Sequence, residues 1–202
     1  MSTAGDRPTD PGAALWRPKL VALDIDGTLL RWAPDGGGNT LMEMPEKVRD
    51  AVLRAYEAGA HVVLASGRSP HGMTPVADLL GLPPDGDDRL WIVAANGAIV
   101  LRYPPVDIVH EETFDASAAV EAILAKRPNV LVAVENRGEG YLVNRPFPMG
   151  ELSGDLALSE VADMVAEPVS RVIIRDPEST AEEFLELGRE LGLQGIDYVV
   201  GY

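Results

Sequence analysis

Residues 20–30 of this 202-residue chain read Leu-Val-Ala-Leu-Asp-Ile-Asp-Gly-Thr-Leu-Leu, and this stretch decides the fold class. The apolar run over residues 20–25 does not alternate with polar residues, which is typical of a strand buried on both faces of a parallel sheet. Asp24 and Asp26 stand at the C-terminal end of that run, where open α/β sheets bind ligands. Because they are two positions apart, their carboxylates are expected to project to the same side.

Strands and helices alternate along the first half of the chain, which predicts βαβ units and a parallel sheet. Proline near the start and glycine after the end mark the helices. A Pro- and Gly-rich segment at residues 34–39 predicts the tip of a hairpin or flap. Strands are expected over residues 20–25, 61–65 (again buried), 90–95 and 98–102, and helices over residues 45–58 and from Ser69 or Thr74 to Gly81.

The pattern changes after Pro104 and Pro105, and the second half predicts a separate α+β module on an open sheet. Three segments are therefore expected: a flexible tail at residues 1–18, an α/β core at 19–105 and the α+β module at 106–202. Strands are expected over residues 107–113, 130–135, 141–144, 169–175 and 196–200, with one helix over 115–127 capped by Asp115 and another over 179–191 with Ser179 and Glu182 as capping box.

The composition excludes several classes of function. Asp and Glu number 32 against 17 Lys and Arg, and the net charge of −15 argues against nucleic acid and anionic membranes as partners. The chain has no Cys and three His, so thiolate and His-rich metal sites are not expected. No signal peptide or membrane-spanning stretch is predicted, which favours a cytoplasmic protein. The groups that remain for a functional site are carboxylates, hydroxyls and a hard cation.

The paired carboxylates suit a cation. Asp24 and Asp26 repel each other unless a positive charge lies between them, and Mg²⁺ would keep Asp24 ionised as a nucleophile while Asp26 holds or releases a proton. Gly27 allows close approach of the backbone to a ligand, and Thr28 offers a hydroxyl. The alternative interpretation is a plain Asp-Gly turn.

A second polar loop follows the next predicted strand, with Ser66, Gly67 and Arg68 in sequence. A small hydroxyl beside backbone N–H groups at a helix start can bind an anion, and a guanidinium can bind phosphate or sugar oxygens. The alternative is that Ser66 and Ser69 only cap the helix while Arg68 is solvated.

Together, residues 20–30 and Leu64-Ala-Ser-Gly-Arg-Ser69 resemble motifs I and II of the haloacid dehalogenase (HAD) phosphatases. Asn96-Gly97-Ala98 and the long α+β stretch resemble the Cof-type, class IIB members. The resemblance implies a HAD-like Rossmannoid core with an inserted α+β cap domain.

By the same resemblance, Asp24 attacks phosphorus to form an aspartyl-phosphate, and Asp26 acts as acid and then base. Asp24 and the Asp26 carbonyl would ligate Mg²⁺. The phosphoryl group would be bound by Ser66, with Gly27, Thr28 and Gly67 beside it, and the rest of the substrate by Arg68.

The family's motif III lysine and motif IV acidic segment are not found, since the lysines are Lys19, Lys47 and Lys126 and Gly154-Asp155 is expected in a loop or at a helix start. The chain therefore reads as a truncated, weakly active phosphatase for small phosphomonoesters, such as a sugar phosphate or a phosphorylated cofactor. A half-built sheet would expose apolar surface and favour self-association.

One alternative function is that of a non-catalytic protein that binds phosphorylated metabolites. A receiver-type signalling domain is a weaker alternative, because Ser66 occupies the position where such a domain carries its phospho-accepting Asp.

Overall fold

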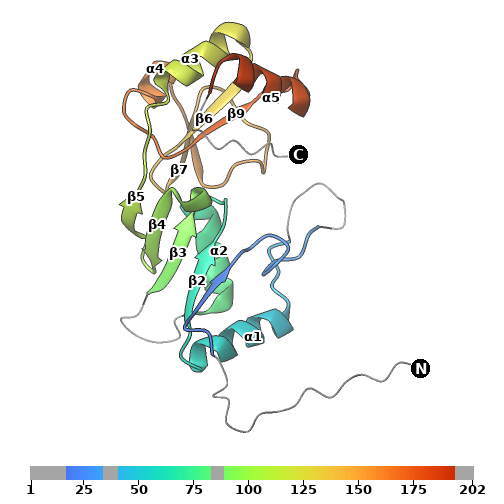
Figure 1. Ribbon diagram of the computed structural model, residues 1–202, viewed down its shortest axis with the longest axis vertical. Coiled ribbons are helices and arrows are strands. Elements are labelled where there is room, and N and C mark those ends of the chain that lie inside the picture. Colours follow the sequence, from blue (N-terminus) through green and yellow to red (C-terminus); the bar gives the residue numbers. More distant parts are fainter. Residues whose placement is uncertain (1–16, 34–40, 83–88, 194–202) are drawn as a thin grey trace, which may run out of the picture.

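The computed structural model describes residues 17–33, 41–82 and 89–193, which form two units stacked end to end, each with its own sheet (Figure 1). Most of the expected tail, the expected flap at 34–39 and the expected strand at 196–200 lie outside the described residues. We call the part up to residue 111 the first unit and the part from residue 117 the second unit.

The first unit holds a five-stranded sheet in the order β1-β2-β3-β4-β5. The first three strands are parallel, as expected from the alternation of strands and helices, and the last two are antiparallel. The fifth strand lies in the range assigned from sequence to the α+β module, yet it pairs with β4. The strands are β1 (Leu20–Leu23), β2 (His61–Ala65), β3 (Leu90–Ala94), β4 (Ile99–Tyr103) and β5 (Asp107–Glu111).

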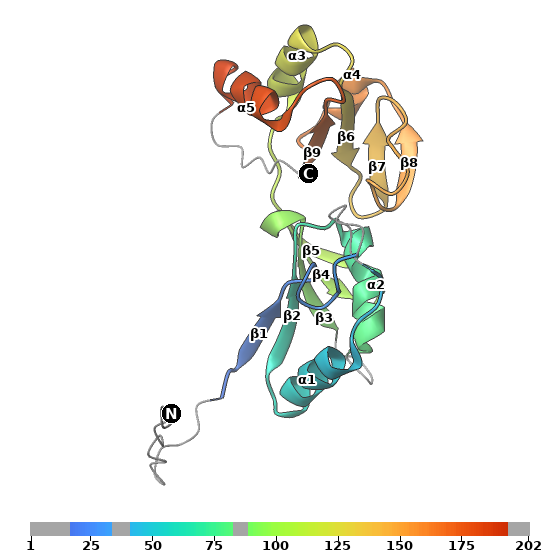
Figure 2. The same cartoon turned by 90° about the vertical axis from the view of Figure 1, so that its right-hand side faces the viewer.

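Helices α1 (Glu46–Glu57) and α2 (Pro70–Leu80) cover one face of this sheet (Figure 2). The α2 boundaries follow the predicted signals, because Ser69 Oγ accepts a hydrogen bond from the Gly72 N–H and Gly81 ends the helix at φ 67°. Pro45 precedes α1 as its N-cap instead of occupying the first helical position. Ile25, Leu64 and Ile92 are fully buried under these helices.

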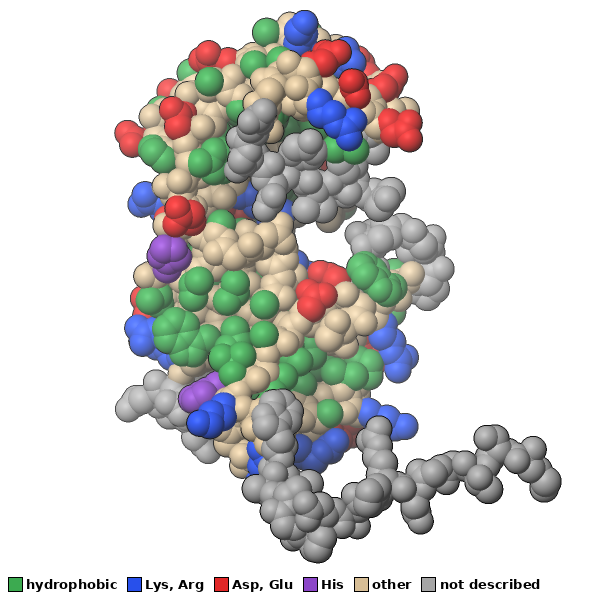
Figure 3. All heavy atoms as spheres, viewed as in Figure 1, with side chains coloured by type: hydrophobic (Ala, Val, Ile, Leu, Met, Phe, Trp, Pro, Cys, Tyr) green, Lys and Arg blue, Asp and Glu red, His purple; other side chains and the backbone are tan. Residues whose placement is uncertain are grey.

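The prediction that the first two strands are buried on both faces is wrong. Strand β1 pairs only with β2 among the described residues, and Leu20 is 56% exposed. The face away from α1 and α2 carries Trp91, 42% exposed, with the Arg102 guanidinium 5.8 Å from the centre of its ring. Figure 3 shows a broad group of hydrophobic side chains on the first unit. The strands were predicted to be buried because they carry apolar residues on both faces. In the structure, no described element covers the face away from α1 and α2.

The second unit has a four-stranded sheet in the order β8-β7-β6-β9, covered by helices on one side (Figure 2). Its core is built on Val120, Val130 and Val132. Its strands are β6 (Leu131–Glu135), β7 (Gly140–Val143), β8 (Asp155–Leu158) and β9 (Val172–Arg175), and its helices α3 (Ser117–Lys126), α4 (Val161–Met164) and α5 (Ala181–Glu190).

Several details of the second unit correct the sequence predictions. Gly154 lies in the loop before β8, as expected, whereas Asp155 is the first residue of β8, which pairs in parallel with β7, and no helix starts there. The capping box of α5 lies one residue later than expected, at Thr180 and Glu183. Asp115 does accept the Ser117 N–H at 2.9 Å, but α3 begins two residues after it. Helix α4 was not predicted at all.

No helix in the described ranges is both long and apolar enough to cross a membrane.

Candidate functional site

Three loops leave the first sheet at the same edge. Strands β1 and β2 run parallel with Leu23 opposite Leu64, and β2 and β3 run parallel with Ala65 opposite Val93. The chain therefore emerges at neighbouring positions from the ends of all three strands. These loops carry Asp24 to Thr28, Ser66 to Ser69, and the 3₁₀ turn η1 (Ala95–Gly97).

The loop after β1 is a tight turn closed by the Ile25 carbonyl. This oxygen accepts the N–H groups of Thr28, Leu29 and Leu30 at 2.9–3.2 Å, and the Ile25 side chain is fully buried. Gly27 has φ +78°, a conformation that favours glycine, and its N–H donates to the Leu30 carbonyl at 2.9 Å. The Gly27 N–H is thus used inside the turn. Asp24 is exposed at the strand end.

The second loop meets the first through an ion pair. Arg68 Nε lies 3.0 Å from Asp26 Oδ2, and Arg68 Nη2 lies 2.6 Å from Asp26 Oδ1. The two side chains are 24% and 29% exposed, so the pair is partly shielded from water. Such two-point contacts fix both partners in orientation. Two residues that were selected from separate sequence motifs therefore contact each other. Arg68 was expected to bind the substrate, and in the structure it binds the Asp26 carboxylate.

The loop at residues 66–69 is also tied to the third loop. The Ala95 N–H donates to the Arg68 carbonyl at 2.8 Å, and the Asn96 N–H donates to the Ser66 carbonyl at 3.2 Å. Ala95 and Asn96 both have positive φ, an uncommon conformation for residues with a Cβ. A Cβ on Gly67 would lie 2.7 Å from Asn96 Oδ1, so a larger residue there would displace the Asn96 side chain. The sequence signal for this contact was only the Asn96-Gly97 turn.

The second unit touches this same loop, which sequence reasoning missed. Arg171 Nη1 donates to the Gly67 carbonyl at 2.7 Å, and the hydroxyls of Ser69 and Ser153 lie 2.9 Å apart. Arg171 and Gly67 are 104 residues apart in sequence, and no local pattern links them. Contacts from both units therefore determine the geometry around Ser66.

The residue whose N–H donates to the Arg171 carbonyl is a buried acid, Glu135. Glu135 is 6% exposed, and neither of its carboxylate oxygens makes a well-formed hydrogen bond within the described part of the chain. Burial raises the pKa of Glu135, while the Tyr141 hydroxyl and the positive charge of Arg171 partly offset that rise. Burial likewise raises the pKa of Tyr141 to about 12, so the phenol is neutral at physiological pH.

The donor set at Asp24 and Asp26 consists of oxygen atoms, the ligands that Mg²⁺ prefers. Within the described ranges, no group of three or more acidic or His residues comes together as a metal site. Mg²⁺ is usually held by one or two carboxylates and keeps several waters, so an exposed carboxylate and a neighbouring carbonyl fit such an ion.

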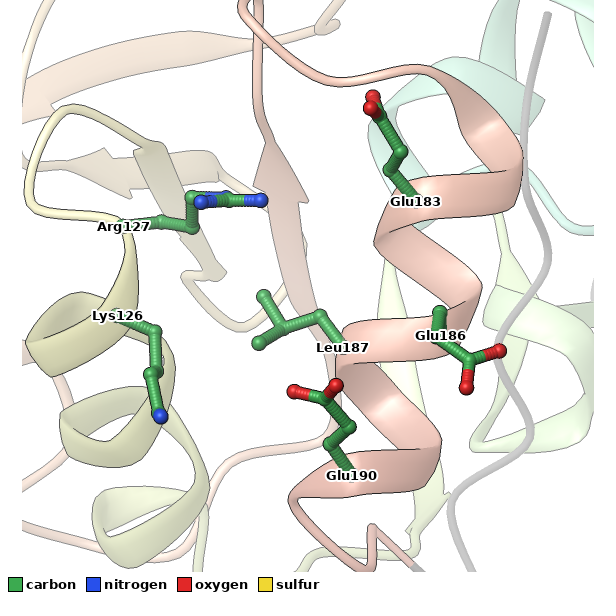
Figure 4. A pocket seen from close by; sticks show the side chains of 6 residues that line it. All are labelled: Lys126, Arg127, Glu183, Glu186, Leu187 and Glu190. Carbon is green, nitrogen blue, oxygen red and sulfur yellow. The ribbon is translucent and has the colours of Figure 1, made fainter.

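One hollow among the described residues lies elsewhere, between α3 and α5 of the second unit. Lys126 and Arg127 face Glu183, Leu187 and Glu190 across it (Figure 4). Its lining charges largely oppose each other, and none of its residues belongs to the three loops. It is therefore separate from the candidate site.

The model of one family, described as haloacid dehalogenase-like hydrolase, matches residues 21–172. The chain therefore belongs to this family, as residues 20–30 and 64–69 indicated. Among individual relatives, YxeH of Bacillus subtilis is 38% identical over 93 residues, covering 46% of this chain and 30% of YxeH. Phosphatase YwpJ of the same organism is 29% identical over 105 residues, covering 52% of this chain and 32% of YwpJ. The chain thus spans about a third of the length of these relatives.

Solved structures show the same fold. A haloacid dehalogenase-like hydrolase from Bacteroides thetaiotaomicron has a TM-score of 0.63 at 21% identity, covering 89% of this chain and 65% of that one. The subclass IIB sugar phosphatase BT4131 has a TM-score of 0.60 at 15% identity, covering 86% and 64%. The expected HAD-like α/β fold class is confirmed.

Proposed function

We propose that this chain carries the site of a phosphatase that removes the phosphoryl group from small phosphomonoesters, such as a sugar phosphate or a phosphorylated cofactor. The observation that carries the proposal is the contact between Asp26 and Arg68, which brings the two polar loops together beside Ser66. Family membership and the phosphatase YwpJ support the same reaction class.

In this proposal Asp24 is the nucleophile. Its carboxylate oxygen attacks phosphorus, the bond from phosphorus to the ester oxygen breaks, and an aspartyl-phosphate forms. Asp26 gives a proton to the departing oxygen, then takes one from the water that hydrolyses the aspartyl-phosphate. Arg68 orients the Asp26 carboxylate through its two contacts. Ser66 lies at the end of the neighbouring strand, where its hydroxyl would bind the phosphoryl oxygens.

Phosphate monoesters hydrolyse so slowly in water that an enzyme must lower the barrier by on the order of 20 kcal/mol. Asp24 and the Asp26 carbonyl would hold Mg²⁺, which, when bound, would stabilise the negative charge of the phosphoryl group. The N–H groups near Gly67 and the hydroxyl of Thr28 would contribute further donors to the same oxygens.

We also propose that the second unit acts as a cap that selects the substrate, since Arg171 and Ser153 contact the loop beside Ser66. In this proposal the cap begins after residue 111, since the chain leaves the first sheet after β5. A cytoplasmic location, where small phosphorylated metabolites are found, is part of the proposal.

A second function is favoured by one observation. The carboxylate assigned as acid and base is bound at both oxygens by Arg68. This arrangement suits a protein that binds phosphorylated metabolites without turning them over, because a paired carboxylate has less freedom to exchange protons.

The test is phosphate release from a small phosphomonoester with Mg²⁺, comparing the wild-type chain with Asp24→Asn. We expect slow release by the wild type and none above buffer by the variant, with circular dichroism showing both folded. Mass spectrometry of acid-quenched wild type should detect one added phosphoryl group, which the variant lacks. Equal release by both proteins would contradict the phosphatase proposal. Tight binding of the ester without release would favour the second function.

A further inference from the structure

Contacts from the second unit gather on a short stretch of the first unit, the loop at residues 66–69 and the start of α2. Ser153 Oγ lies 2.9 Å from Ser69 Oγ, and a Cβ on Gly72 would lie 3.0 Å from that same Ser153 oxygen. Gly138, in the turn between β6 and β7, lies against Pro70. Arg171 adds a charged donor to these contacts, through its bond to Gly67.

The Arg171 bond acts on one particular peptide group. The carbonyl of Gly67 and the N–H of Arg68 belong to the same planar unit, so fixing one fixes the direction of the other. The carbonyl accepts from Arg171 Nη1 at 2.7 Å, while the N–H points at Ser66 Oγ at 3.4 Å. A positive donor on the carbonyl also polarises the peptide and strengthens its N–H as a donor.

Arg171 is itself held in place. The Glu135 N–H donates to the Arg171 carbonyl at 3.1 Å, which fixes the backbone at the entry to β9. The positive charge of its guanidinium also acts on the buried Glu135 carboxylate and on the buried Tyr141 hydroxyl, lowering the pKa of each against the rise that burial causes. A buried carboxylate without well-formed hydrogen bonds is costly unless a positive charge is near. Arg171 supplies such a charge, and its attraction offsets part of the cost of burying Glu135.

We propose that Arg171 is a positioning residue: its bond to the Gly67 carbonyl orients the Gly67–Arg68 peptide, and through it the Ser66 hydroxyl, for binding a tetrahedral phosphate group. This role rests on the proposed function, since it assumes that the loop binds phosphate. It also couples the placement of the second unit to the affinity of the first for phosphate.

The test measures binding of inorganic phosphate to the full chain with Mg²⁺ by isothermal titration calorimetry, with ¹⁵N–¹H spectra following the Arg68 amide. Arg171→Met should weaken phosphate binding by about 10- to 100-fold, the effect of losing one charged hydrogen bond. The Arg68 amide resonance should shift in the variant even without phosphate. A merely structural arginine would change the melting temperature but not the affinity for phosphate.

Arg175→Met is the matched control. Arg175 lies on β9 and forms an exposed ion pair with Glu151 at 2.8 Å, so its loss should leave phosphate affinity unchanged. Arg171→Lys keeps the positive charge beside Glu135 but loses the guanidinium fork, and should weaken binding to an intermediate degree. If Arg171→Met fails to fold, the phosphate affinity of Arg171→Lys tests the proposal.

The outcomes separate the two proposals. A wild-type chain that binds no phosphate overturns the proposed function and this role with it. A wild type that binds phosphate, with a folded Arg171→Met variant, or Arg171→Lys where Arg171→Met does not fold, equal to it in affinity, overturns the role of Arg171 alone, whatever the Arg68 amide resonance does.

Discussion

Arg68 and Asp26, from the ends of two neighbouring parallel strands, meet through two contacts of 3.0 and 2.6 Å. This pair joins the two sequence motifs in space, and it fixes a carboxylate that would otherwise repel Asp24. The loops of the first unit are thus held by charge as well as by backbone hydrogen bonds.

Arg68→Met should lower the free energy of unfolding by about 1–2 kcal/mol, because a partly shielded carboxylate loses its partner. Arg89→Met is the control: Arg89 lies 2.7 Å from Asp107, which keeps Arg102 at the same distance. We expect a change below about 0.5 kcal/mol there. Urea denaturation followed by circular dichroism measures both, and equal losses would contradict a special role for the Asp26 pair.

Gly27→Ala should destabilise the protein by about 2–4 kcal/mol, since the backbone has φ +78° and a Cβ would overlap the Trp32 indole. Gly59→Ala separates the two causes, because Gly59 has φ +89° with nothing within 4 Å of the added Cβ. Strain alone should cost about 1 kcal/mol at Gly59. Thermal unfolding of both variants gives the comparison, and identical losses would show that the indole simply moves aside.

Tyr141→Phe should change how stability depends on alkaline pH. The pKa of Tyr141 is raised by burial to about 12 in the folded chain, above the ordinary value of 10.0. The folded state therefore holds this proton more tightly, and the wild type loses up to about 1.4 kcal/mol per pH unit between about pH 10 and 12. The variant lacks this component. Urea titrations from about pH 9 to 11 should show the shallower slope, and parallel slopes would place Tyr141 in contact with water.

Glu135→Gln should gain stability relative to the wild type as pH rises. Burial raises the pKa of Glu135 above its ordinary 4.5, so the wild type loses stability as pH rises through the folded-state pKa. Glutamine has no such loss. The free energy of unfolding of the variant, relative to that of the wild type, should be higher at neutral pH than at about pH 4. Glu121→Gln, on the exposed side of α3, controls for the removal of one charge. A stability difference that does not vary with pH would contradict this assignment.

The elements next to the candidate site could be predicted from sequence because their signals are local. The end of β1 is marked by Asp24, which follows an apolar run. The start of α2 is marked by Ser69, which precedes a proline at the first helical position. Sequence failed where the deciding neighbour is distant. Leu20 is as apolar in an exposed edge strand as in a buried one, so its environment could not be read from its type.

Other features left no readable pattern. Strand β8 is four residues long and exposed along its length, so it shows no alternation, and it exists because it pairs with β7. Arg171 could have been any surface arginine until the fold brought it to Gly67.

The strand order of the two sheets bears on the order of folding. In the first sheet every strand pairs with its neighbour in sequence, whereas β9 in the second sheet must find β6 across the intervening β7, β8 and α4. Short loops close at lower entropic cost than long ones. Strands β3 and β4 are joined by the turn at residues 95–97, so this antiparallel pair should form before β9 reaches β6. Pulsed hydrogen exchange during refolding would then protect the β4 amides before those of β9. The turn that holds the Ser66 loop is accordingly built before Arg171 arrives, and the last native contacts to form complete the geometry of that loop.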